Sequence, residues 1–192
     1  MNNKPPSIYS IYSVYTQHSL ALKPIDTWGT PMQKLFECGR GCLYRVITPS
    51  ERKRFRDIMD RYNVWGYVKQ APFMKRRMDI VYCIGDDWCV LFTIHLQTNP
   101  TILTKYGLEW GRTWFLRRVA TNEECKEKYG DITVEAHRCL IEWLKKRGEH
   151  AVTALAITED ERRSGATYKH LGFEEVGRTV KGHGRWFILK LR

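Results

Sequence analysis

Residues 158–179 read TEDERRSGATYKHLGFEEVGRT, and this stretch decides how the rest of the chain is interpreted. The spacing of side chains over 166–171 predicts a short helix. Gly172 follows directly, which is typical of the left-handed residue that ends a helix. Residues 173–176 then favour a strand, and Gly177 interrupts it.

The regions on either side extend this pattern. Residues 151–157 (AVTALAI) form a continuous apolar run, which favours a strand buried on both faces. Residues 132–147 have the apolar spacing of a helix that ends in basic residues before Gly148. Residues 186–191 predict a final strand. The C-terminal half therefore predicts helix, buried strand, short helix and two strands.

The N-terminal half predicts one helix and several strands. The helix begins with a capping box, in which Thr48 is the N-cap and Glu51 the third helical residue. The other expected segments are strands over 43–47, 79–84, 88–96 and 112–120, a turn region over 99–111, and a charged loop over 121–130. Residues 1–42 are expected to form an extended arm and an irregular connection. The arm carries a Ser-Ile-Tyr repeat over 7–15 that either docks on the domain or offers a stacking surface.

The segment Tyr168–Gly177 (YKHLGFEEVG) resembles the C-terminal signature of the Gcn5-related N-acetyltransferase (GNAT) superfamily, roughly aliphatic-Tyr-x-x-Leu-Gly-Phe-x-x-x-Gly. Thr167 stands where an aliphatic residue is usual. The order of predicted elements over 43–191 is also similar to that superfamily. The resemblance implies an α/β (α+β) fold, in which helices flank a central mixed, mostly antiparallel sheet formed by residues 43–192.

The same resemblance implies an acyl-CoA-dependent N-acyltransferase, with acetyl-CoA as the expected donor and an amine as the acceptor. Tyr168 stands where the family often has the tyrosine that protonates the departing thiolate. The strand over 116–119 is expected to pair its backbone with the pantetheine arm and to polarise the thioester carbonyl. These strand residues are Leu116, Arg117, Arg118 and Val119. The candidates for a general base are Glu109, Glu124 and His95, and a water relay is an equal alternative.

The loop that should bind the coenzyme A pyrophosphate departs from the family pattern Q/R-x-x-G-x-G/A. Only Gly130 of that pattern remains, with Thr133 where a second small residue is expected. Lys126 and Lys128 are expected to supply compensating charge. The departure leaves three alternatives: weaker coenzyme A binding, a modified binding mode, or a different donor. Arg163 stands beside the last helix, where the coenzyme is expected to pass, as does its neighbour Ser164.

A fainter similarity connects Gly165–Tyr168 (GATY) with the phage DNA adenine-modifying enzymes of the Mom type, which are GNAT relatives. That similarity implies a DNA base as the acceptor. The formal net charge of +11 favours a polyanion such as DNA or RNA, or a phosphorylated ligand. A generic basic surface is the alternative. A nucleic-acid-binding module without catalytic activity is therefore a third hypothesis.

The six cysteines are expected to be ordinary reduced thiols. Cys38 and Cys42 form a C-x-x-x-C pair without a matching second pair of ligands, so no metal site is predicted. No apolar run approaches the roughly 18 residues of a membrane span, and the N-terminus lacks the features of a signal peptide. We therefore expect a cytoplasmic protein without a membrane partner. The oligomeric state is left open.

Overall fold

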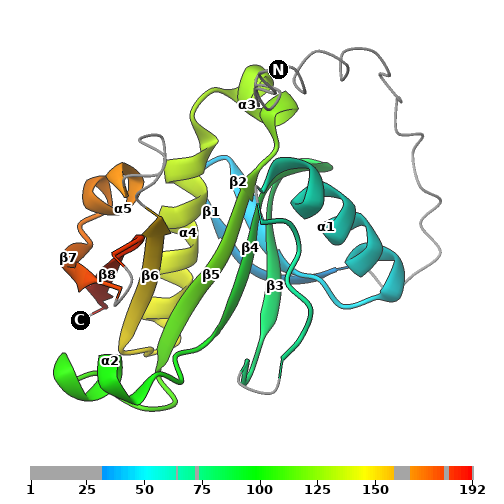
Figure 1. Cartoon of the computed structure of the whole chain (residues 1–192). Helices are drawn as coiled ribbons and strands as arrows, with labels where there is room; N and C mark the ends of the chain where they lie inside the picture. Colours follow the sequence, from blue (N-terminus) through cyan, green and yellow to red (C-terminus); the bar gives the residue numbers. More distant parts are fainter. Residues whose placement is uncertain (1–31, 64, 72–73, 158–164, 180–181, 192) are drawn as a thin grey trace, which may run out of the picture.

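The computed structural model describes residues 32–63, 65–71, 74–157, 165–179 and 182–191. The Ser-Ile-Tyr repeat, Arg163 and Ser164 lie outside the described residues. The described strands are β1 (Gln33–Cys38), β2 (Gly41–Arg45), β3 (Met78–Ile84), β4 (Asp87–Leu96), β5 (Thr113–Thr121), β6 (Ala151–Ile157), β7 (Glu174–Arg178) and β8 (Gly184–Lys190). The described helices are α1 (Pro49–Tyr62), α2 (Pro100–Lys105), α3 (Glu123–Tyr129), α4 (Ile132–Lys146) and α5 (Ala166–His170) (Figure 1).

The strands form one mixed sheet in the order β1-β2-β3-β4-β5-β6-β8-β7. All neighbours in the described sheet are antiparallel except β5 and β6, which run parallel. The predicted α/β fold with a mostly antiparallel sheet is therefore confirmed. The predicted strands over 79–84 and 88–96 are also confirmed, as β3 and β4, and the structure pairs them as a hairpin.

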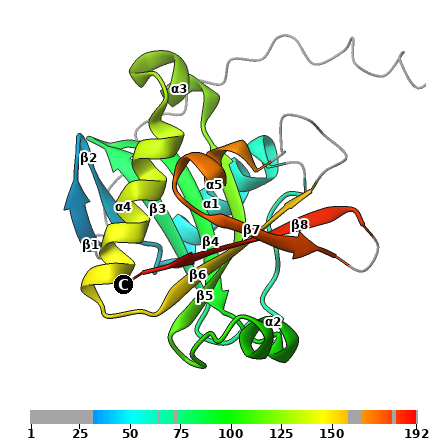
Figure 2. The same cartoon turned by 90° about the vertical axis from the view of Figure 1, so that its left-hand side faces the viewer.

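Helices cover the sheet on both faces. Alternate strand side chains point to opposite faces, and the apolar side chains on each face pack into a separate core. The α4 face buries Phe92 of β4 together with Leu140 of α4. The α1 face buries the neighbouring Leu91 together with Phe55 of α1. Figure 2 shows α4 in front of the sheet and α1 behind it. Each strand therefore presents alternate side chains to a different set of neighbours.

The predicted start of α1 is confirmed in detail. The Thr48 hydroxyl accepts a hydrogen bond from the Glu51 backbone N–H at 3.3 Å, and the Glu51 carboxylate accepts one from the Thr48 backbone N–H at 2.9 Å. This reciprocal pair satisfies two of the N–H groups that every helix leaves open at its start.

Three segments differ from the sequence-based expectation. Residues 33–38 were expected to be irregular but form β1, which pairs with β2 at the edge of the sheet. The charged segment 121–130 was expected to be a loop but contains α3. The turn region 99–111 contains α2. All three elements are short, so local sequence gives little signal for them.

The expectation that all cysteines are reduced is wrong. A disulfide joins Cys38 at the end of β1 to Cys139 in α4, 101 residues later in the chain. Cys42, Cys83, Cys89 and Cys125 are free. Sequence spacing did not indicate this pair, because the fold alone brings β1 against α4.

A polar cluster reinforces the same junction. Arg40, in the turn between β1 and β2, donates to the Glu135 carboxylate of α4 at 2.6 Å, and the buried Tyr82 hydroxyl donates to it at 2.7 Å. Burial alone would raise the pKa of Glu135, but hydrogen bonds from Arg40 and Tyr82 lower this pKa to about 2. Gly39 has a φ of +58°, and a Cβ there would lie 2.5 Å from the Glu135 carboxylate. A side chain at this position would strain the backbone and press against the Glu135 carboxylate, so glycine favours this fit of the turn against α4. We call Arg40, Tyr82 and Glu135 the hairpin cluster.

Candidate active site

The parallel strands β5 and β6 separate partway along their length. They pair from Thr113 and Ala151 to Leu116 and Ala154, and no further. Beyond that point β5 stays paired with β4, and β6 stays paired with β8. Figure 1 shows the two strands side by side near α2 and apart at their ends. The two strands therefore leave a wedge between them.

A cavity of about 280 Å³ occupies the wedge. Its lining comes from α1, β5, α4, β6, α5 and the segment that follows α1. The lining residues are Tyr62, Asn63, Trp65, Phe115, Leu116, Arg117, Arg118, Val119, Thr133, His137, Leu155, Ala156, Ile157, Gly165, Ala166, Thr167 and Tyr168. The cavity is therefore bounded by elements from both faces of the sheet.

A β-bulge lies in β5 at the point where the strands separate. Thr93 of β4 pairs with Arg118 and the next residue, Ile94, pairs with Leu116, so Arg117 has no partner in β4. A bulge leaves the extra residue unpaired and redirects nearby side chains. Beyond Leu116 the edge of β5 that faces β6 has no strand partner, and this edge lies at the wall of the cavity.

Tyr168 projects into the cavity from α5. Its ring packs against Phe173 at 5.3 Å, Phe187 at 5.4 Å and His137 at 6.1 Å between centroids. Its hydroxyl has no hydrogen-bond partner among the described residues, and burial raises the pKa of Tyr168 to about 12. The phenol is therefore protonated at neutral pH and can donate a hydrogen bond to a ligand.

Gly165 sets the start of α5 and so the position of Tyr168. Its φ is +82°, and a Cβ there would lie 2.3 Å from the Phe187 ring. Gly165 therefore allows the close approach of a neighbouring side chain. The neighbour is Phe187, a core residue of β8.

His137 is a lining residue that the sequence analysis did not single out. Its Nδ1–H donates to the Thr133 carbonyl oxygen, one helical turn earlier, at 2.7 Å. Burial lowers the pKa of His137 to about 4, so the ring is neutral at pH 7 and its Nε2 carries a lone pair. The sequence offers one signal for a buried position at His137. It directly follows Ala136, an apolar residue on the buried side of α4.

The N-terminus of α4 lies at the edge of the cavity. Thr133 lines the cavity, and the N-cap residue Asp131 makes no side-chain capping hydrogen bond. The first N–H groups of a helix have no partner within it, and they carry a partial positive charge. This end of α4 can therefore bind an anionic group through its backbone.

The expected pyrophosphate loop has a different structure here. Residues 123–129 form α3, and Gly130 caps that helix with a φ of +80° and a hydrogen bond to the Lys126 carbonyl oxygen. Lys126 pairs with Glu123, and Lys128 pairs with Asp87 at 2.9 Å. The two lysines and Gly130 do not line the cavity, so the backbone donors nearest to it are those of the first turn of α4 after Ile132, whose own N–H donates to the Gly130 carbonyl oxygen at 2.8 Å.

The three candidate general bases do not line the cavity. Glu109 lies before the start of β5, where its carboxylate is 2.7 Å from His150 Nδ1 and 2.6 Å from Arg112. His95 is buried in β4 and donates through Nδ1 to the Leu96 carbonyl oxygen. Glu124 is exposed on α3 and lies 3.8 Å from Arg61. The described part of the cavity therefore contains no carboxylate.

The structure brings six of the predicted site residues together at the cavity. They are Leu116, Arg117, Arg118, Val119, Thr133 and Tyr168. Within the described ranges, no group of three or more His, Cys, Asp or Glu side chains could hold a metal ion. In the same ranges, no helix is long and apolar enough to cross a membrane.

Comparison with proteins of known structure identifies the fold. The N-acyl amino acid synthase FeeM, from uncultured soil microbes, aligns with a TM-score of 0.57 at 15% identity over 79% of this chain and 90% of its own. A probable GNAT-family acetyltransferase from Chromobacterium violaceum gives 0.55 at 11% identity, covering 85% and 93%. The ribosomal-protein-S18-alanine N-acetyltransferase from Escherichia coli gives 0.53 at 14% identity, covering 79% and 94%.

These similarities establish the GNAT fold, and the predicted resemblance is confirmed at that level. No family model matches the sequence, and no curated protein matches it. At such low identities the comparisons carry the fold and not the reaction. The functional argument therefore depends on the geometry of this chain's own cavity.

Proposed function

We propose that this protein transfers an acyl group from a coenzyme A thioester, with acetyl-CoA the first candidate, to an amine. The observation that carries the proposal is the wedge between β5 and β6, whose cavity reaches a tyrosine hydroxyl with no partner among the described residues. A thioester arm is long and narrow, and an opening between two strands offers it backbone groups on either side.

The proposed donor position uses two features of the wedge. Beyond Leu116, the edge of β5 that has lost β6 as its partner is proposed to pair with the pantetheine arm, and its backbone N–H groups to stabilise charge on the thioester oxygen. The N–H groups of the first turn of α4 after Ile132 are suited to the pyrophosphate. The start of α4 is thus proposed to bind the pyrophosphate in place of the glycine-rich loop of the family pattern. This proposal corresponds to the second of the three alternatives from the sequence, a modified mode of coenzyme A binding.

Tyr168 is proposed to act at the leaving group. The amine nitrogen forms a bond to the thioester carbon, the C–S bond breaks, and one amine proton finally resides on the sulfur. A hydroxyl whose pKa is about 12 stays protonated throughout and donates a hydrogen bond to the sulfur as negative charge develops. The departing group is therefore stabilised as a thiolate before it receives the proton.

The amine proton is proposed to leave through water. No carboxylate among the described residues lines the cavity. His137 has a pKa of about 4, which suits a hydrogen-bond acceptor better than a general base. Its Nε2 can orient the attacking amine or a water molecule without becoming charged.

Isothermal titration with acetyl-CoA is the first test. We expect saturable binding that survives Tyr168→Phe. The hydroxyl is proposed to contact only the leaving sulfur, and the contacts along the rest of the pantetheine arm are kept in this variant. His183→Gln, in the turn before β8, is a matched control outside the cavity lining. Absence of heat at millimolar acetyl-CoA in a folded sample would reject the proposal.

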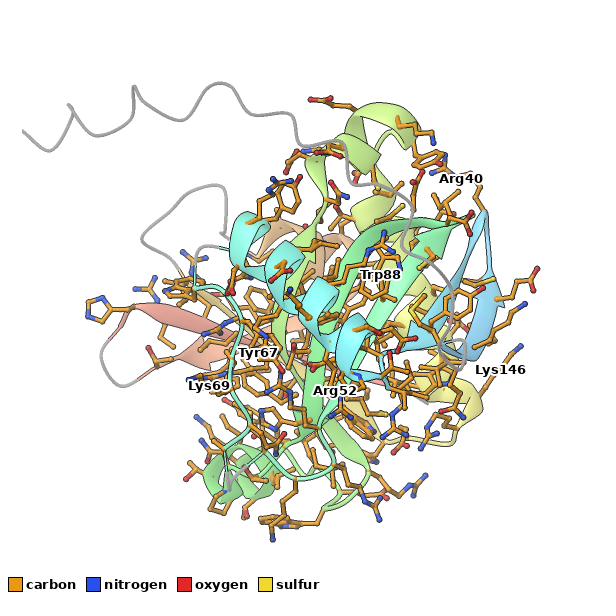
Figure 3. All side chains as sticks on the ribbon, turned by 90° about the vertical axis from the view of Figure 1, so that its right-hand side faces the viewer. Arg40, Arg52, Tyr67, Lys69, Trp88 and Lys146 are labelled. Carbon is orange, nitrogen blue, oxygen red and sulfur yellow. A yellow bond between two sulfur atoms is a disulfide. The ribbon has the colours of Figure 1, made fainter. Side chains whose placement is uncertain are left out.

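A nucleic-acid base is a second candidate acceptor, and the surface next to the cavity favours it. Helix α1 and the following segment carry exposed basic residues, and Figure 3 shows this face with Arg52, Tyr67 and Lys69 labelled. Two acidic side chains on this surface are exposed, Asp57 and Asp60. The exposed basic side chains outnumber them, and they are Arg52, Lys53, Arg56, Arg61, Lys69, Lys75 and Arg76. Tyr62 and Trp65 connect this surface to the cavity.

Two measurements separate the nucleic-acid alternatives. A base-modifying enzyme of the Mom type predicts an added mass on nucleosides from cells that express the protein, and Tyr168→Phe should reduce it. A binding module without catalysis predicts salt-sensitive DNA or RNA binding that Tyr168→Phe leaves intact, with unaltered nucleosides.

A further inference from the structure

The bulge in β5 places two consecutive arginines on one face of the sheet. Phe115 pairs with His95 and Arg118 pairs with Thr93, and these β4 residues are two positions apart, so they share a face. The Arg117 guanidinium lies 5.8 Å from the centre of the Phe115 ring, which puts Arg117 on that face too. A regular strand would have sent one of the two arginines to the opposite face.

Neither arginine is neutralised by the described part of the chain. No carboxylate there lies within ion-pair distance of Arg117 or Arg118, and the Nε atom of each is buried without a hydrogen-bond partner. Burial, and for Arg118 also the charge of Arg117, lowers the pKa of both side chains. Two half-buried like charges at one site favour an anion between them.

Arg77 shows how the same fold treats a buried arginine that serves structure. Its guanidinium is 3.0 Å from the Asp79 carboxylate, with only 6% of the side chain exposed. It also donates to the Val68 carbonyl oxygen. The contrast indicates that the arginines of β5 are held for a group that the described chain does not contain.

Contacts from the end of α1 hold this site in shape. The Arg118 guanidinium lies 5.5 Å from the centre of the Trp65 ring and donates to the Arg117 carbonyl oxygen at 3.0 Å. Asn63, the C-cap of α1, donates to the Val119 carbonyl oxygen at 2.7 Å. The two cations therefore sit in a preformed mouth of the cavity, on the α1 face.

We propose that Arg117 and Arg118 bind an oxyanion carried by the acyl acceptor, so that the acceptor is an amine that also bears a phosphate or carboxylate group. This inference rests on the proposed acyl transfer. The arginines face α1, whereas Thr133 and the start of α4 belong to the opposite face and are suited to the donor's pyrophosphate. The planar guanidinium fork binds phosphate and carboxylate oxygens in pairs, which fixes the acceptor's orientation as well as its charge.

The test compares acceptor probes that differ only in their anionic group. O-phosphoethanolamine, β-alanine and a short single-stranded DNA offer a monophosphate, a carboxylate and a phosphodiester, and ethanolamine is the neutral control. We expect at least one anionic probe to bind the wild-type protein. Arg117→Gln and Arg118→Gln should each weaken that probe at least tenfold and should leave ethanolamine unchanged. The probe that binds shows whether the site recognises a monophosphate, a carboxylate or a phosphodiester.

Lys190→Gln provides a matched control, because it removes one exposed positive charge at the far end of β8. Arg118→Lys keeps the charge but loses the fork, so it should restore only part of the affinity. If neither arginine variant weakens any anionic probe more than Lys190→Gln does, the inference is overturned. A large fall in melting temperature with unchanged probe binding would assign the arginines a structural role and would also overturn it.

Acetyl-CoA titration of the same variants separates this inference from the proposed function. We expect the acetyl-CoA dissociation constant to change less than twofold in Arg117→Gln and Arg118→Gln. Loss of acetyl-CoA binding in these variants, with unaffected acceptor probes, would place the arginines at the donor and overturn the inference. If wild-type protein binds no acetyl-CoA but binds an anionic probe through the arginines, the acyl-transfer proposal fails and the oxyanion site stands.

Discussion

The hairpin cluster and the two arginines of β5 treat charge in opposite ways. In the hairpin cluster, Arg40 and Tyr82 both bind Glu135, and the Cys38–Cys139 disulfide closes the same junction. Arg117 and Arg118 lie together without an acid among the described residues. The charged groups of the hairpin cluster are paired within the fold, whereas the two arginines are the groups that we propose bind a ligand.

The largest effect on stability is expected from breaking the disulfide at the closed junction. Cys38→Ser should lower the free energy of unfolding by about 4 kcal/mol, because the bond closes a loop with a separation of 101 residues. Urea unfolding under oxidising conditions measures this loss. Cys42→Ser, which removes a free thiol from the adjacent strand, should change the midpoint little. Equal midpoints for Cys38→Ser and the wild type would show that the junction does not depend on this bond.

The next largest effect is expected on the rate of acyl transfer, when the Tyr168 hydroxyl is removed from the cavity. Tyr168→Phe should reduce acyl transfer about 100-fold, because it removes the proposed donor to the leaving sulfur, while the fold is kept. Release of free thiol from acetyl-CoA in the presence of the best acceptor probe measures the rate. The hydroxyl has no described partner to lose, so the melting temperature should stay nearly constant. A stability loss with an unchanged rate would make Tyr168 a packing residue.

Glu135→Gln should destabilise the closed junction by about 2 kcal/mol. The glutamine keeps an acceptor for Tyr82 but loses the charge that Arg40 binds, and Arg40 is half exposed, which reduces the value of the pair. Thermal or urea unfolding checks the loss. Lys34→Gln removes one member of an exposed pair on the same hairpin and should cost well under 1 kcal/mol.

The pH dependence of stability follows from the same carboxylate. The pKa of Glu135 falls from 4.5 to about 2 on folding, so its contribution is complete above pH 4.5 and is lost as pH falls towards 2. Urea midpoints between these pH values should decline more steeply for the wild type than for Glu135→Gln. Parallel curves for the two proteins would contradict the assignment of this pKa shift.

The smallest effect on stability is expected at Arg117 and Arg118, where loss of a charged side chain should not destabilise the protein. Arg118→Gln removes one of two repelling cations, so stability should stay within about 0.5 kcal/mol of the wild type or rise slightly. Differential scanning fluorimetry at low and high salt checks this, because salt screens the repulsion in the wild type. A loss as large as that of Glu135→Gln would remove the contrast between the two regions.

The sequence predicted those features that depend on local chemistry. The capping box at Thr48, the buried strand over 151–157 and the glycine stop at Gly172 are each set by a few neighbouring residues, and all three are confirmed. The position of Tyr168 at the cavity followed from the resemblance of a ten-residue segment.

The features that were missed depend on tertiary structure. β1 is an exposed edge strand, which is held by backbone pairing and by the Cys38 disulfide. His137 becomes a neutral cavity residue only because α4 packs against the sheet. The shared face of Arg117 and Arg118 depends on a register shift between two strands, and a single strand's sequence does not contain that information.

Gly165 restricts how the cavity can be redesigned. Its backbone is left-handed, and the Phe187 ring occupies the space of any side chain, so mutagenesis at this position would displace α5 before it altered a ligand contact. Thr167 is half-buried and already lines the cavity, and no such restriction applies to its backbone. A directed-evolution library for new acceptors should therefore randomise position 167 and hold position 165 constant.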